Sequence, residues 1–64
     1  MKWIDTLNIA ISLAEKYPHE DVRNISFTDL KKHVITLNEF DDDSNNCNEK
    51  ILESIQQNWL DEIE

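Results

Sequence analysis

The sequence predicts a mainly α-helical domain with three helices and at most a very short extended strand. Apolar residues recur at helical spacing in three separate segments. The chain has no glycine and a single proline, which disfavours tight hairpins and flexible linkers. Its 64 residues are enough for one small core. We therefore expect a single domain over residues 1–64.

The first predicted helix starts at Asp5 or Thr6, either of which can act as its N-cap, and runs to about Tyr17, where Pro18 ends it. Trp3 either packs just ahead of the cap or contacts a partner. The buried stripe has the spacing i, i+3, i+4 and i+7, and comprises Ala10, Leu13, Ala14 and Tyr17, widened by Ile9.

The second predicted helix follows residues 25–27, whose alternation permits a very short strand or an extended arm. Thr28 is its predicted N-cap, with Asp29 in the first turn, where the helix dipole favours an acid. His33 borders the buried stripe, and we interpret it as a histidine at the core edge, because no second ligand stands at metal-site spacing. The stripe itself comprises Leu30, Val34 and Leu37, closed by Phe40.

The third predicted helix starts near Asn46, because Asn46 and Glu49 stand three apart in the pattern of a capping box. The segment before it, residues 39–47, is the longest irregular stretch. The predicted core residues of this helix are Ile51, Leu52, Ile55, Trp59, Leu60 and Ile63.

The composition is strongly acidic, with 14 acidic and 6 basic residues and a net charge of −8. Such a chain repels nucleic acid and anionic lipid and attracts cations or a basic protein surface. No apolar run is long enough for a membrane span, and the N-terminus lacks the features of a signal peptide. The only cysteine, Cys47, excludes an internal disulfide and fits a reducing compartment. We expect a soluble monomer of the cytoplasm, or of the mitochondrial matrix or another organelle in a eukaryote.

Two clusters of acids stand where folding has little use for them. Asp41, Asp42 and Asp43 repel one another and add nothing to a core, although a short acidic run can be merely a solvated loop. Asp61 and Glu62 lie at the end of the third helix, where the dipole already disfavours anions. We interpret both clusters as serving an interaction outside the fold.

The chemistry available to these clusters is limited. Carboxylates without His or Cys partners suit hard or borderline ions such as Ca²⁺, Mg²⁺, Mn²⁺ or Fe²⁺. An EF-hand loop starting at Asp42 fails because Cys47 replaces the glycine that its turn needs. A weak, exposed cation site fits better. Cys47 alone cannot hold an iron–sulphur cluster, and a chain this small has little volume for a substrate cleft, so we expect no enzyme.

Three helices with an extended arm also resemble a winged-helix body, for which DNA binding is the usual first hypothesis. The acidic field opposes the phosphates, so we expect no nucleic-acid partner.

The order of short motifs resembles the IscX family, which comprises small acidic accessory proteins of bacterial iron–sulphur cluster assembly. The resemblance spans the chain and includes Trp3, Asp5, Tyr17-Pro18, Phe27-Thr28-Asp29-Leu30, Phe40-Asp41-Asp42-Asp43, Asn48-Glu49-Lys50-Ile51-Leu52-Glu53 and Trp59-Leu60-Asp61-Glu62. It implies a winged-helix-like, mainly helical domain. It also implies that an acidic surface binds a cysteine desulfurase and modulates it without catalysis, and that the protein takes up Fe²⁺ weakly.

The resemblance assigns partner binding to Asp41, Asp42, Asp43 and Glu49 first, with Glu53 and Asp29 as weaker members. Weak, exchangeable Fe²⁺ binding is expected at Asp5, Asp41, Asp42, Asp43, Asp61 and Glu62. The alternative is a carboxylate-based ferrous iron buffer or carrier with no obligatory protein partner.

The sequence departs from the family pattern at several positions. His19, His33 and Ser44 stand where relatives tend to have Asp, Trp and Pro, and Leu7, Asn8 and Ile11 occupy positions that are often acidic. The anionic surface on the first helix is therefore expected to be thinner here.

Overall fold

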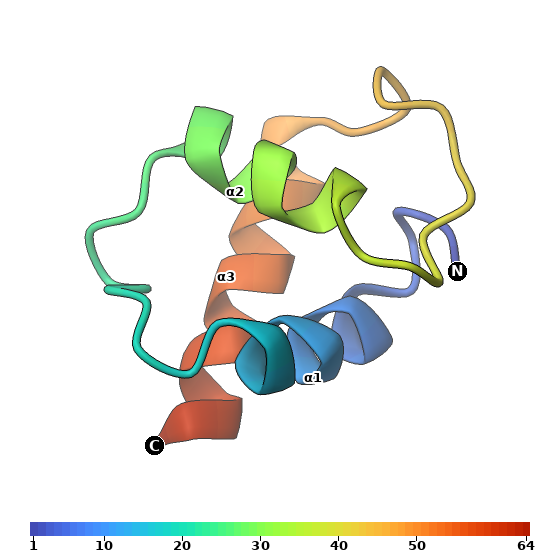
Figure 1. Cartoon of the computed structure of the whole chain (residues 1–64). Helices are drawn as coiled ribbons and strands as arrows, with labels where there is room; N and C mark the ends of the chain where they lie inside the picture. The colour runs from blue at the N-terminus through green and yellow to red at the C-terminus, as the bar shows by residue number, and fades with distance from the viewer.

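The computed structural model describes all 64 residues and contains three helices: α1 (Thr6–Lys16), α2 (Phe27–Ile35) and α3 (Glu49–Ile63) (Figure 1). The prediction of a mainly α, three-helix domain is confirmed. No strand accompanies the helices, so the likeness to winged-helix domains depends on the helices alone. None of the three helices is long and apolar enough to cross a membrane.

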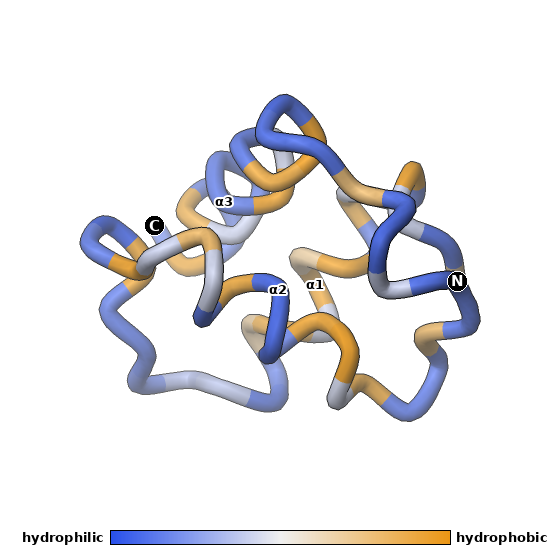
Figure 2. Tube along the Cα trace, turned by 90° about the horizontal axis from the view of Figure 1, so that it is seen from above, coloured by the Kyte–Doolittle hydropathy of each residue, from blue (hydrophilic) through white to orange (hydrophobic).

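The core lies where α1 and α2 pack against α3, and α1 makes the more extensive contact. In Figure 2 the hydrophobic stretches of the trace lie mostly in the helices, whereas much of the connecting loops is hydrophilic. The buried cluster comprises Trp3, Ile9, Ala10, Leu13, Val22, Leu30, Val34, Leu37, Leu52, Ile55 and Trp59.

Most of the predicted core residues are buried or half-buried, but Ile63 is exposed, and the buried Val22 was not among those predicted. Ile63 was expected inside, but its side chain is 47% exposed because α3 extends beyond the body of the molecule in its last turn (Figure 1). Val22 was missed because it stands alone in a polar segment, yet it is only 2% exposed. Gln56 Nε2 on α3 donates a hydrogen bond to the Val22 carbonyl at 2.8 Å and fixes this segment against the helix.

Two helices begin at caps other than the predicted ones. Ser26, not Thr28, caps α2, because its extended backbone places Oγ 3.1 Å from the amide of Asp29. Phe27 is consequently the first residue of the helix and not part of an extended arm. Asn48, not Asn46, caps α3 and accepts a 2.9 Å hydrogen bond from the amide of Ile51.

Trp3 belongs to the core, so its interpretation as an exposed partner contact is wrong. Its side chain is fully buried and meets the ring of Phe40 edge to face, with 4.8 Å between ring centroids. The neighbouring Ile4 is instead 79% exposed.

His33 lies at the edge of the core, as predicted. Its half-buried ring stacks on Tyr17, with 4.2 Å between centroids, and its Nε2 pairs with the carboxylate of Glu20. These contacts join α2 to the segment that follows α1.

Candidate functional site

The acidic loop, defined here as residues 39–48, is fastened to the N-terminal segment of residues 1–5, and Figure 1 shows the two side by side. The amide of Asp41 donates to the carbonyl of Met1 at 2.9 Å, and the indole Nε1 of Trp3 donates to the carbonyl of Asp43 at 2.8 Å. The Lys2 ammonium also donates to the carbonyl of Asp41. The loop therefore has a defined position although it contains no regular structure.

Asp42 is the residue that organises this loop. Its Oδ2 accepts from the amide of Trp3 at 3.1 Å, while its Oδ1 accepts from the amide of Asp43 at 2.7 Å and from Asn46 Nδ2 at 3.0 Å. These bonds favour the ionised form, so the pKa of Asp42 is lowered, chiefly by Asn46 and then by the Trp3 amide. The expectation that the fold has no use for this run of aspartates is thus wrong for Asp42. Asn46 lies within a turn of the acidic loop, where its backbone amide donates to the Asp43 carbonyl at 3.0 Å, and α3 starts only at Glu49.

Asp41 and Asp43, in contrast, present their charges to solvent. The Asp41 side chain is 89% exposed, and its one cationic neighbour is Lys2, whose Nζ lies 3.6 Å from Oδ2. Both partners of this pair are exposed, so the pair contributes little to stability. Another cation can therefore displace Lys2 from Asp41 easily. Asp43 Oδ1 accepts only from the amide of Asn45, at 2.9 Å, and the residue is exposed.

The other predicted partner residues, Glu49, Glu53 and Asp29, lie at different distances along the chain from this loop. Glu49 is exposed in the first turn of α3, directly after the loop, and Glu53 is exposed one turn further along the same helix. Asp29 is exposed in the first turn of α2, at the opposite end of that helix from the acidic loop. None of these three carboxylates forms an ion pair.

The acids at the C-terminal end form a separate group. Asp61 and Glu62 are exposed in the last turn of α3, at the far end of the helix from the acidic loop (Figure 1). Asp61 Oδ1 accepts from Gln57 Nε2 at 3.1 Å, and Glu64 pairs with Arg23. The two clusters that the sequence suggested therefore do not make one site.

The carboxylates proposed for iron do not converge. No group of three or more His, Cys, Asp or Glu side chains is placed to hold a metal ion. Asp5 is occupied locally, because its Oδ2 accepts from the amide of Lys2 at 2.8 Å and closes the turn before α1. Iron binding by these residues stays a prediction.

Sequence reasoning missed the residues that position the loop. Lys2 and Trp3 stand 39 or 40 residues before their partners in the loop, so no local pattern could connect them. Asn46, the predicted cap, instead donates a hydrogen bond from its Nδ2 to Oδ1 of Asp42 within the loop.

Comparison with known proteins gives two findings. Residues 1–64 match the family model described as iron–sulphur cluster assembly. A protein of Pseudomonas aeruginosa, itself described as uncharacterized, is 47% identical over 62 residues, which cover 97% of this chain and 94% of the relative.

Proposed function

This chain belongs to the IscX family of iron–sulphur cluster assembly proteins, and we propose that it acts in that process as an acidic accessory protein that binds a cysteine desulfurase and modulates its activity. It is an adaptor in this proposal and not an enzyme. The observation that carries the proposal is the acidic loop, in which Asp42 holds the backbone while Asp41 and Asp43 are exposed.

The charge distribution supports a basic docking partner. Among the partner residues proposed above, only Asp41 forms an ion pair, and both members of that pair are exposed. Asp43, Glu49 and Glu53 keep their charge available along the loop and the first turns of α3. A fixed array of like charges attracts a basic surface and steers its approach. Asp29 lies in the first turn of α2, apart from this surface, and is a weaker member of the proposed set.

Ferrous iron is a secondary ligand in this proposal. Exposed carboxylates that do not converge bind a divalent ion weakly and exchange it readily, because few oxygens can reach one ion together. The same geometry disfavours the alternative of a tight iron carrier. We expect a calorimetric titration with Fe²⁺ alone, without oxygen, to give weak binding, and tight binding without a partner would favour the carrier.

The partner role is tested by neutralising exposed charges while Asp42 is kept. The double variant Asp41→Asn/Asp43→Asn should weaken binding to a cysteine desulfurase by about tenfold, or 1.4 kcal/mol, because it removes two charges from the docking surface. Binding is measured by calorimetry, and helical content by circular dichroism.

The matched control is Asp61→Asn/Glu62→Gln, which removes the same number of charges at the other end of α3. We expect it to leave affinity nearly unchanged. Equal losses of affinity in both double variants would mean that only the net charge matters. If Asp41→Asn/Asp43→Asn loses no affinity, the acidic loop is not part of the interface.

A further inference from the structure

The ammonium group of Lys2 forms the only ion pair of the acidic loop. Its Nζ lies 3.6 Å from Oδ2 of Asp41 and also donates a hydrogen bond to the Asp41 carbonyl. One residue of the loop thus offers two oxygens, one from its carboxylate and one from its backbone, to the same cation. We call these two atoms the Asp41 oxygen pair. An ammonium or a guanidinium can donate to both of them at once.

The backbone around Lys2 is fixed beside the loop. The Lys2 amide donates to Oδ2 of Asp5 at 2.8 Å, and the Lys2 carbonyl accepts from the Asp5 amide at 3.0 Å. On either side, the Met1 carbonyl accepts from the amide of Asp41 at 2.9 Å, and Trp3 is fully buried. A cation held this close acts at a high effective concentration, because only its own side chain has to move for it to return to the loop.

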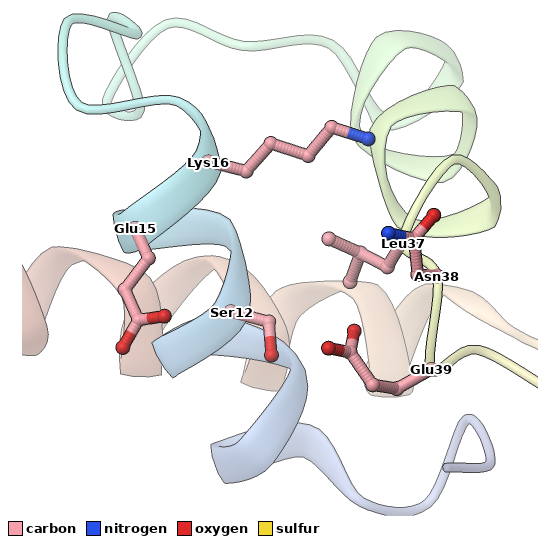
Figure 3. A pocket seen from close by; sticks show the side chains of 6 residues that line it. All are labelled: Ser12, Glu15, Lys16, Leu37, Asn38 and Glu39. Atoms are coloured by element: carbon pink, nitrogen blue, oxygen red, sulfur yellow. The ribbon is translucent and has the colours of Figure 1, made fainter.

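The other cations of the chain do not pair with the carboxylates of the loop. Lys16 lines a groove of about 380 Å³ between α1 and the segment after α2, but its Nζ donates to the carbonyl of Thr36 at 2.8 Å (Figure 3). In the same view the carboxylate of Glu39 points toward α1. Lys50, in the first turn of α3, forms no ion pair. Lys2 is therefore the one internal cation that occupies a carboxylate of the loop.

The pair between Lys2 and Asp41 can be exchanged for a pair with another molecule. Both side chains are largely exposed. Exposed ion pairs are weak, because solvent screens the charges and because holding two flexible side chains together costs entropy. The Lys2 side chain can therefore turn into solvent while the backbone of both residues stays in place.

We propose that Lys2 is an internal competitor for docking: it occupies the Asp41 oxygen pair in the free protein, and a lysine or arginine of the basic partner replaces it in the complex. This inference rests on the proposed function, because it needs the acidic loop to be part of the interface. Docking then exchanges one ion pair for another, and the Lys2 ammonium moves into solvent. The exchange lowers affinity, because the partner gains only the difference between the two pairs.

The test measures the affinity of the full chain and its variants for a cysteine desulfurase by calorimetry at low salt. Lys2→Gln removes the competitor and should bind about threefold more tightly than the parent chain, since an exposed ion pair has a small effect. Lys50→Gln is the matched control, because it removes one positive charge just after the loop from a residue without an ion pair. We expect a smaller gain with Lys50→Gln. Equal gains, or no gain with Lys2→Gln, would overturn the proposal.

A second background shows whether the effect depends on Asp41. In Asp41→Asn the carboxylate for which Lys2 competes is gone, so Lys2→Gln should gain no more affinity than Lys50→Gln. A gain that stays about threefold in this background would contradict the proposal. All three side chains are exposed, so we expect every variant to fold, and thermal unfolding checks this.

The same titrations separate this inference from the proposed function. If the parent chain does not bind the desulfurase at low salt, the proposed function fails and the inference fails with it. If the parent chain binds but Lys2→Gln and Lys50→Gln gain equally, the inference alone fails.

Discussion

At the scale of single residues, the run Asp41, Asp42 and Asp43 divides its work between the fold and the surface. Asp42 accepts three hydrogen bonds and fixes the acidic loop against Trp3. Asp41 and Asp43 extend into solvent from the backbone that Asp42 holds. The mutual repulsion of the three aspartates is thus tolerated because the three hydrogen bonds accepted by Asp42 offset it.

Replacing Asp42 tests this division. Asp42→Asn keeps the shape but removes the charge and one of the acceptor oxygens, so we expect a lower midpoint in urea denaturation than for the parent chain. The control is Asp41→Asn, whose carboxylate is 89% exposed and should leave the midpoint nearly unchanged. If the urea midpoint falls equally for both variants, Asp42 does not organise the loop.

The lowered pKa of Asp42 also predicts a pH dependence. Because the folded pKa lies below the ordinary value of 3.8, Asp42 stabilises the fold above that value, and the stabilisation is lost as pH falls through the folded pKa. We expect the parent chain to lose stability below about pH 4 more steeply than Asp42→Asn. Parallel acid denaturation curves for the two proteins would refute this.

The residue scale is also where sequence reasoning was weakest. The exposed positions of Asp41, Asp43 and Glu49 follow from their charge, and the structure places all three at the surface. The role of Asp42 could not be predicted, because its bond to the Trp3 amide joins residues 39 positions apart. Long-range hydrogen bonds of this kind leave no periodic pattern in a sequence.

At the scale of elements, periodicity predicted the three helices, but cap chemistry left their starts ambiguous. Ser26 and Thr28 are both good capping residues, and so are Asn46 and Asn48. In the structure Ser26 and Asn48 accept the first-turn amides of Asp29 and Ile51, whereas Asn46 lies in a turn of the acidic loop and Thr28 lies inside α2. The start of a helix therefore depends on where the chain enters the helical conformation as well as on residue type.

The cap of α2 gives a direct comparison between two similar residues. Ser26→Ala should destabilise the protein by about 1 kcal/mol, because the amide of Asp29 loses its partner. Thr28→Ala should change stability by less than about 0.5 kcal/mol, because Thr28 is exposed within the helix. Thermal or chemical unfolding of both variants decides, and a larger loss in Thr28→Ala would place the cap where the sequence alone suggested.

At the scale of the whole molecule, α3 separates two acidic ends of a small body. The acidic loop and Glu49 lie at its start, while Asp61 and Glu62 lie at its end (Figure 1). The net charge of −8 makes the whole molecule acidic. Only the start of α3, however, is continuous with a loop that the N-terminal segment holds in place. A docking surface confined to one end orients a partner, whereas charge alone would only attract it.

We propose that this surface binds a cysteine desulfurase through charge, and the affinity of the unmodified chain for the desulfurase at two ionic strengths tests this. Raising the salt from about 0.01 M to about 1 M shortens the screening length from about 30 Å to about 3 Å. We predict clear binding at low salt that weakens strongly at high salt. Absence of binding at low salt, or an affinity that does not change with salt, would contradict the account.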